Sequence, residues 1–220
     1  MMNLISHRGV HNRKIKENTI EAIEAAFGNG FDSVEIDIRS TKDNILVLSH
    51  DADLQRVFGK GLKISSSRYD LLHSKCEGLA TLHEVINKFP KKEILVEVKD
   101  RKSFRDLDEK LLPKTYRVQS FDWEGISKLA KTTKLTCGLL FPSYHLKLTS
   151  SFLLNRKWFW SQLKKNNIKF ISIASFLISK KFILEAKIEG IELFVWTIRK
   201  KSQIEKYKEL GIGNLITEVK

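Results

Sequence analysis

The sequence predicts a (β/α)8 barrel, and three observations lead to that fold class. Eight short runs rich in β-branched and aromatic residues alternate with seven amphipathic helical segments along the chain. No repeat of fixed length and no linker rich in Pro, Gly and Ser interrupts this alternation. The length of 220 residues suffices for one full core and is near the lower limit for such a barrel. We therefore expect residues 1–220 to form a single domain.

The expected elements can be placed by residue number. Strands are expected at residues 4–6, 33–38, 94–98, 116–121, 135–141, 170–174, 193–198 and 214–217. Helices are expected at residues 19–27, 81–89, 104–111, 123–131, 152–165, 180–188 and 201–210. For the first helix, Asn18 is the expected N-cap and Glu21 its capping-box partner. Strands separated by helices indicate right-handed crossovers and a parallel sheet.

One segment breaks the alternation. Residues 45–50 look like a strand, but they follow the second strand after only residues 39–44. That spacing is too short for a parallel crossover, which needs about a dozen residues. Asp43 and Asn44 are turn residues that tolerate positive φ. We therefore expect an antiparallel hairpin extending from the second strand, and its return brings His50 toward the barrel mouth.

Composition narrows the class of protein. Lys and Arg number 39 against 26 Asp and Glu, so the formal net charge of +13 favours anionic ligands. No apolar run approaches the roughly 20 residues of a membrane-spanning helix, and the first residues lack the features of a signal peptide. Cys76 and Cys137 are far apart, which favours a reducing compartment and no zinc site. We expect a cytoplasmic protein that binds no specific nucleic acid, because no basic-aromatic recognition motif is present.

Polar residues gather where the predicted strands end, and in this fold class the carboxyl ends of the strands carry the chemistry. Charged residues in strands built of Val, Ile and Leu are costly unless they are paired or bound to metal. Their collection at strand ends therefore indicates a functional site. The residues concerned are His7, Arg8, Glu35, Asp37, Glu97, Lys99 and Trp196.

Three of these residues predict a metal site. Glu35 and Asp37 are two apart and share one face of their strand, and Glu97 can join them from the neighbouring strand. An all-oxygen site without thiols favours Mg²⁺ or Ca²⁺, with Mn²⁺ possible. Arg8 offers a bidentate fork for a phosphate and Lys99 a point charge.

Two histidines complete the predicted chemistry. His7 and His50 can supply one general base and one general acid, because imidazole titrates near neutral pH. Which histidine is the acid stays open, since the two can titrate as a coupled pair. A metal, two cations and two histidines are the set that phosphodiester hydrolysis requires.

Motifs along the whole chain resemble, in order, those of the glycerophosphodiester phosphodiesterases. They are His7-Arg8-Gly9, Glu17-Asn18-Thr19, Glu35-Ile36-Asp37, Thr41-Lys42-Asp43 running on to His50-Asp51, Glu97-Val98-Lys99, Ser120-Phe121 and Trp196-Thr197. The resemblance implies a TIM barrel that hydrolyses small glycerophosphodiesters to glycerol 3-phosphate and an alcohol with a divalent cation. It implies the following roles: His7 and His50 as the acid/base pair, Glu35, Asp37 and Glu97 as metal ligands, Arg8 and Lys99 at the phosphate, Trp196 at the substrate, and Glu17 and Asn18 in support.

The sequence departs from the family pattern in four places. Lys16 replaces a proline and Asn44 a glycine, both in loops. Arg199 stands where the family has asparagine, and the closing Thr-Asp-x-Pro is Thr217-Glu218-Val219-Lys220. The roles of Arg199 and Glu218, the alcohol headgroup and the oligomeric state stay open.

Alternatives remain for residues and for function. His7 can be a hydrogen-bonded interior histidine, Glu97 and Lys99 a mutual ion pair, and Trp196 a packing residue. A lysophospholipase D-like activity on lipid or glycolipid phosphodiesters is a second functional hypothesis. A barrel that binds metal and phosphodiester without turnover is a third.

Residues 152–165 raise the question of membrane contact. Trp158, Phe159 and Trp160 are consecutive, and successive helical positions differ by about 100°, so at least one is expected to be exposed. With Arg156, Lys157, Lys164 and Lys165 on the same helix, weak contact with an anionic membrane surface is one hypothesis. The alternative is that the aromatic rings pack between neighbouring helices.

Overall fold

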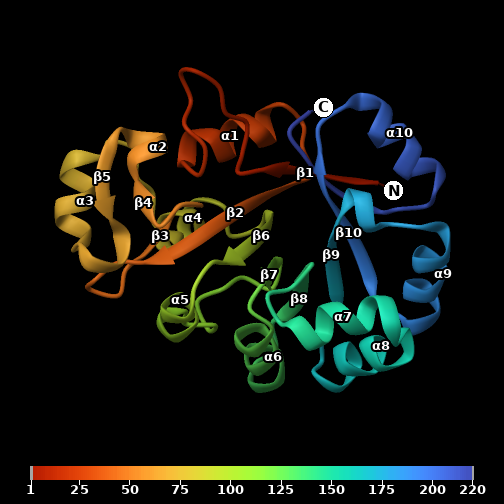
Figure 1. Ribbon diagram of the computed structural model, residues 1–220. Coiled ribbons are helices and arrows are strands. Elements are labelled where there is room, and N and C mark those ends of the chain that lie inside the picture. Colours follow the sequence, from red (N-terminus) through yellow and green to blue (C-terminus); the bar gives the residue numbers. More distant parts are fainter. Residues whose placement is uncertain (1, 220) are drawn as a thin grey trace. The chain divides into compact units, whose positions relative to one another are not determined.

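The computed structural model describes residues 2–219, which contain both strands and helices (Figure 1). The strands are β1 (Asn3–His7), β2 (Ser33–Ser40), β3 (Leu46–Leu48), β4 (Asp53–Leu54), β5 (Lys60–Lys63), β6 (Glu93–Val98), β7 (Tyr116–Ser120), β8 (Thr136–Phe141), β9 (Phe170–Ala174), β10 (Glu192–Ile198) and β11 (Asn214–Thr217). Each of the eight predicted strands is present, with ends shifted by at most two residues.

The helices follow the predicted order, with additions. They are α1 (Ile20–Gly28), α2 (Gln55–Phe58), α3 (Tyr69–Lys75), α4 (Leu82–Lys88), α5 (Arg101–Asp106), α6 (Trp123–Thr132), α7 (Leu146–Leu154), α8 (Arg156–Lys165), α9 (Lys180–Glu189) and α10 (Lys201–Glu209), with 3-10 turns η1 (Ile64–Ser66) and η2 (Ser175–Leu177). Within residues 2–219, no helix is both long and apolar enough to cross a bilayer.

The chain divides into two compact units. Residues 6–116 contain the strand order β6-β2-β3, in which β2 is parallel to β6 and antiparallel to β3. Residues 2–5 and 117–219 contain the order β11-β10-β9-β8-β7, with parallel pairing between neighbours. Parallel strands joined by helices are the arrangement that the sequence predicts for a (β/α)8 barrel.

The antiparallel hairpin is confirmed. Strand β3 pairs with the end of β2, so that Ile38 lies opposite Leu48 and Ser40 opposite Leu46. Asn44 adopts a φ of 66° in the turn, a conformation that Asn tolerates better than most residues. Residues 49 and 50 therefore follow a strand that runs back along β2, and Ser49 N donates to Asp37 O at 3.0 Å.

Two helix predictions need correction. The helix expected over residues 152–165 is two helices, because Asn155 leaves the helical conformation at φ −145° and its side chain caps α8 by accepting from Trp158 N. The helix expected over residues 104–111 is α5, which starts and ends earlier. Asp100 accepts a hydrogen bond from Ser103 N and so begins the helix three residues before the expected position.

The cap of α1 also differs from the prediction. Thr19 is the N-cap, and its hydroxyl accepts from Ala22 N at 3.2 Å. Asn18 instead has a φ of 54° and points its side chain at Asp37. Asn18 and Thr19 are both residue types that cap helices, but the side chain of Asn18 is engaged by Asp37.

Residues 52–80 form a small subassembly of their own, for which the sequence predicts no strand or helix. It contains the two-stranded sheet β4-β5, helices α2 and α3, and a separate apolar cluster. Its buried members are Val47, Leu54, Ile64, Leu72, Cys76 and Leu79. The contribution of Val47 ties this subassembly to the hairpin strand β3.

Gly9 follows the first strand where the backbone passes close to α1. Its φ is 78°, and a Cβ placed there would lie 2.6 Å from Ala22 C and 2.7 Å from Ala22 O. Gly9→Ala is therefore expected to lower the free energy of unfolding by about 2 kcal/mol, from strain and overlap together. Gly28→Ala, where a Cβ meets nothing within 4 Å, is the control. Urea denaturation of both variants measures the difference, and equal stabilities would contradict it.

Candidate functional site

Three buried carboxylates converge in the unit formed by residues 6–116. Glu35 and Asp37 lie on β2 and Glu97 on β6, and the parallel register sets Asp37 beside Glu97. The side chains are almost inaccessible, with Glu35 2%, Asp37 1% and Glu97 7% exposed. One carboxylate oxygen from each residue lies within 4.8 Å of the other two. The convergence that the spacing predicts is confirmed.

Burial and mutual repulsion separate the pKa values of the three carboxyl groups. Burial and the Asp37 charge raise the pKa of Glu97 to about 7, and burial with the charges of Asp37 and Glu97 raises the pKa of Glu35. The pKa of Asp37 is lowered, because Lys99, Arg8, His50 and a hydrogen bond from Asn18 together outweigh its burial. The surroundings therefore favour the ionised form of Asp37 and disfavour the ionised forms of Glu35 and Glu97.

Two cations flank Asp37. Arg8 Nε lies 3.3 Å from Asp37 Oδ2, and Lys99 Nζ lies 3.4 Å from Asp37 Oδ1 and also pairs with Glu97. Asp37 Oδ1 nevertheless accepts no hydrogen bond, although it is fully buried. A buried oxygen without a hydrogen bond in a cluster of three carboxylates fits a hard divalent cation, whose preferred ligands are carboxylate oxygens.

Asn18 fixes the orientation of Asp37. Its Nδ2 donates to Asp37 Oδ2 at 2.9 Å, and its Oδ1 accepts from Asp37 N at 3.1 Å. The left-handed backbone of Asn18 is held by a hydrogen bond from its N–H to Arg8 O at 3.0 Å. Asn18 therefore links the loop after β1 to the centre of β2.

Asn18→Gly removes this support and keeps a residue that accepts positive φ. We expect the affinity for a divalent cation to fall between about 10-fold and 100-fold, as is typical when a residue that orients a metal ligand is lost. Isothermal titration with Mg²⁺, Ca²⁺ and Mn²⁺ measures the change, and Asn29→Ala on the exposed end of α1 is the control. Unchanged affinity in Asn18→Gly would show that Asp37 needs no such orientation.

A charged chain connects the first loop to His50. Glu17 accepts from Arg8 Nη1 at 3.1 Å and from Arg56 Nη2 at 2.7 Å. Arg56 Nε in turn donates to Asp51 Oδ2 at 2.6 Å, and the other oxygen of Asp51 lies 2.7 Å from His50 Nδ1. The carboxylate of Asp51 thus orients the His50 ring. Burial lowers the pKa of His50 despite the opposing effects of Asp37 and Asp51.

Arg56 and Arg39 are site residues that sequence reasoning missed. Arg56 lies on α2, inside the segment for which the sequence predicts no strand or helix. Arg39 Nε donates to His50 O at 3.0 Å, and its Nη1 lies 3.2 Å from Asp100 Oδ2. Arg39 is two residues after Asp37 and shares its face of β2, but its contact with His50 depends on the return of the hairpin.

The remaining predicted residues are His7 and Trp196. His7 ends β1 next to Arg8. Trp196 belongs to the other unit, where its Nε1 donates to Ser172 O at 2.8 Å and its ring meets Phe121 edge to face at 5.7 Å. Trp196 therefore has at least a packing role in this unit. The two departures near the C-terminus pair with each other, Arg199 Nε lying 3.1 Å from Glu218 Oε2.

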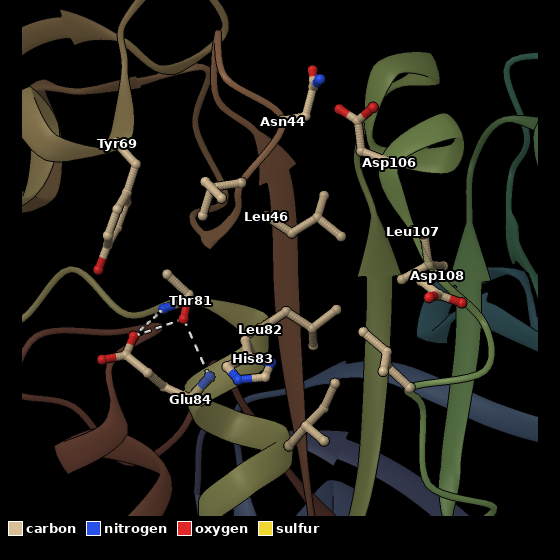
Figure 2. Close-up of a pocket in the computed structure, with 13 residues that line it drawn as sticks. Asn44, Leu46, Tyr69, Thr81, Leu82, His83, Glu84, Asp106, Leu107 and Asp108 are labelled. Carbon is tan, nitrogen blue, oxygen red and sulfur yellow. Dashed lines mark hydrogen bonds between the residues drawn. The ribbon is translucent and has the colours of Figure 1, made fainter.

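A separate cavity of about 550 Å³ lies between β3, α4 and the end of α5 (Figure 2). It is lined mainly by apolar side chains such as Leu46, Leu82 and Leu107, and Figure 2 shows Thr81 and Glu84 joined in the capping box of α4. Its lining includes none of the predicted catalytic or metal-binding residues. This cavity is therefore separate from the carboxylate cluster and contains none of its charged side chains.

Comparison with known families assigns the chain. The model of the glycerophosphoryl diester phosphodiesterase family matches residues 7–219. The chain belongs to this family. A glycerophosphodiester phosphodiesterase of Caldanaerobacter subterraneus subsp. tengcongensis is 24% identical over 244 residues, covering 98% of this chain and 93% of the relative. A lysophospholipase D of Rattus norvegicus is 25% identical over 268 residues, covering 97% of this chain and 82% of the relative.

Solved structures confirm the fold. The glycerophosphodiester phosphodiesterase of Thermotoga maritima superposes with a TM-score of 0.83 at 26% identity, covering 99% of this chain and 95% of that one. A phosphodiesterase of Oleispira antarctica, solved with its product sn-glycerol-3-phosphate, gives a TM-score of 0.81 at 18% identity, with 98% and 92% covered. The chain therefore has the (β/α)8 barrel fold that its sequence predicts.

Proposed function

We propose that this protein hydrolyses glycerophosphodiesters to sn-glycerol 3-phosphate and an alcohol, with a divalent cation held by Glu35, Asp37 and Glu97. The observation that carries the proposal is the buried carboxylate cluster with Arg8 and Lys99 beside it. Membership of the phosphodiesterase family supports it, as does the product found in the Oleispira antarctica relative.

Each charged group has a part in this reaction. A divalent cation bound at the cluster would neutralise charge on the phosphodiester and polarise its phosphorus–oxygen bonds. Arg8 and Lys99 carry further positive charge at the same place, where they can orient the phosphate and stabilise the charge that develops on it. Mg²⁺, Ca²⁺ and Mn²⁺ all suit an all-oxygen site, and we propose Mg²⁺ or Ca²⁺ first.

His7 and His50 are the proposed acid/base pair. Hydrolysis requires one proton to leave the attacking nucleophile and one to reach the departing alcohol oxygen. His50 Nδ1 is engaged by Asp51, so its Nε2 is the nitrogen left for proton transfer. The lowered pKa of His50 keeps more of the ring neutral, the form that accepts a proton. His7 sits next to Arg8 at the end of β1 and is the proposed partner.

A product assay tests the proposal. Purified protein with Mg²⁺, Ca²⁺ or Mn²⁺ is offered glycerophosphocholine, glycerophosphoethanolamine and glycerophosphoglycerol, and released glycerol 3-phosphate is measured enzymatically. We expect release from at least one diester, loss of activity with EDTA and recovery on adding metal back. Absence of product from every diester with every metal would reject the proposal and favour a barrel that binds without turnover.

A second candidate is lysophospholipase D-like hydrolysis of monoacyl glycerophospholipids. Several relatives carry that name, and the chain displays exposed leucines after β8. Rates on glycerophosphocholine and on lysophosphatidylcholine, compared at equal metal, separate the two candidates. A preference for the monoacyl substrate would favour the second.

We also propose that residues 1–220 act as one domain and that the protein is cytoplasmic. The family model covers most of both compact units, which supports a single functional domain. Both cysteines are unpaired and buried, as is common in proteins of reducing compartments.

A further inference from the structure

The unit formed by residues 117–219 displays large apolar side chains on one short stretch. In α7, Leu146, Leu153 and Leu154 are between 75% and 85% exposed, and Tyr144 just before the helix is 76% exposed. The opposite side of α7 is anchored, because Phe152 is buried and its ring lies 4.6 Å from that of Phe141 on β8. The leucines are therefore presented on a fixed helix.

A further exposed ring follows the neighbouring strand. Phe176, in η2 after β9, is 80% exposed. Strands β8 and β9 are parallel, and Phe141 is in register with Ile173, so Tyr144 and Phe176 each come three residues after a matched pair. Both therefore leave the sheet at the carboxyl ends of its strands, which is the end where barrels of this class bind substrates. We call Tyr144, Leu146, Leu153, Leu154 and Phe176 the apolar face.

The excess positive charge of the chain falls in the segment that contains this face. Residues 125–184 contain eleven Lys and Arg and no Asp or Glu, whereas the other 160 residues hold 28 Lys and Arg against 26 Asp and Glu. Four of the exposed lysines of this segment lie on α7 or near the start of another helix. Lys147 lies on α7, and the other three lie in the first turns of helices, Lys157 in α8 and Lys180 and Lys181 in α9. Helices α8 and α9 begin where the chain leaves the carboxyl-end loops, so these lysines are close in the chain to the apolar face.

We propose that the apolar face and its four lysines dock the protein on an anionic lipid surface. Exposed leucine and aromatic side chains beside lysines, in a segment of the chain that holds no Asp or Glu, are the pattern of a helix that lies in a membrane interface. The excess of positive charge in this segment favours this occupant over a second copy of the chain, because two such faces would repel each other. The proposal concerns binding and does not depend on the proposed function.

The location differs from the one that the sequence suggested. Phe159 and Trp160 are buried in α8 and pack against each other and against Phe182, so they are not available to lipid. Trp158 is half-buried, with Lys147 Nζ 5.3 Å from its ring. Membrane contact through residues 152–165 is therefore narrowed to Leu153, Leu154 and Lys157, with α7 and η2 added.

Vesicle co-sedimentation tests the proposal with the whole protein. Vesicles of phosphatidylcholine and phosphatidylglycerol at 3:1 are compared with pure phosphatidylcholine at about 0.1 M salt. We expect at least tenfold tighter binding to the anionic vesicles, because each lysine near the surface contributes about fivefold. Binding should fall steeply at 0.5 M salt, where charges are screened over a few ångströms. Equal binding to both vesicles, or none, would overturn the proposal.

Matched variants locate the surface. Leu153→Ser with Leu154→Ser, and separately Lys180→Glu with Lys181→Glu, should each weaken binding about tenfold or more. The controls are Ile188→Ser, exposed at the far end of α9, and Lys131→Glu with Lys134→Glu at the end of α6. An equal loss of vesicle binding in the controls would show that the binding does not depend on the apolar face. A concentration-dependent dimer that the leucine variant abolishes would show that the face binds a second copy of the chain.

A soluble substrate separates this inference from the proposed function. Hydrolysis of glycerophosphocholine should be the same in wild type and in the leucine variant, since neither leucine belongs to the carboxylate cluster or to its hydrogen-bonding partners. Thermal unfolding of each variant confirms that it is folded. A leucine variant that is folded, binds vesicles like wild type and loses soluble activity would overturn the docking role.

Discussion

Replacing His50 by Ala is expected to lower kcat about 1000-fold and to leave the affinity for a divalent cation within about threefold of wild type. General acid–base catalysis typically contributes between about 10²-fold and 10⁴-fold, and no carboxylate of the cluster is hydrogen-bonded to the His50 ring. Steady-state kinetics on a soluble diester measures the first effect, and isothermal titration with the activating metal measures the second.

The control for this variant is His83→Ala, because His83 is exposed on α4 and outside the cluster. Asp51→Asn gives an intermediate test, since it keeps the shape of the residue but weakens the charge that orients the His50 ring. We expect it to reduce kcat about tenfold. A His50→Ala enzyme that retains more than a tenth of wild-type kcat would remove His50 from the proposed acid/base pair.

Asp37→Asn is expected to abolish both metal binding and activity. Asp37 is the ionised centre of the cluster and touches Arg8, Lys99 and Asn18. An amide in its place supplies a weaker ligand and removes one of the counter-charges of the largely buried cations Arg8 and Lys99, which also destabilises the fold. We expect the metal-dependent rise in Tm seen for wild type to vanish, and the metal-free Tm to fall.

Glu35→Gln should behave differently, and the contrast separates metal binding from folding. Repulsion among three buried carboxylates opposes folding of the metal-free protein, and the raised pKa of Glu35 reflects burial and that repulsion. Removing one charge should therefore raise the metal-free Tm while still weakening metal affinity by 100-fold or more. Differential scanning calorimetry with and without metal tests this. If both variants bind metal like wild type, the three carboxylates do not form the metal site.

Much of the fold could be predicted because one pattern dominates it. Runs such as residues 170–174 and 214–217 are short, apolar and bounded by helices, so their type and order were clear. The hairpin was predictable from a spacing too short for a crossover. The break at Asn155 was not, because residues on both sides of it favour a helix, and the two helices depend on the Asn155 cap together with the packing of Phe152 on Phe159.

The candidate site was predictable where the strand itself sets the geometry. Glu35, Asp37 and Glu97 converge because residues two apart share a face and neighbouring strands are in register. Arg56 and Arg39 were missed because their contacts depend on the fold of residues 52–80 and on the return of the hairpin. Tertiary contacts between loops leave no periodic signal in a single sequence.

The measurement that bears most directly on the central claim is the release of glycerol 3-phosphate as a function of bound metal. Metal-free protein is titrated with Mg²⁺ or Ca²⁺ while product formation from an active diester and metal occupancy are followed together. We predict that activity rises in proportion to occupancy of a site that Asp37→Asn removes. Full activity in metal-free protein, or undiminished activity in Asp37→Asn, would contradict it.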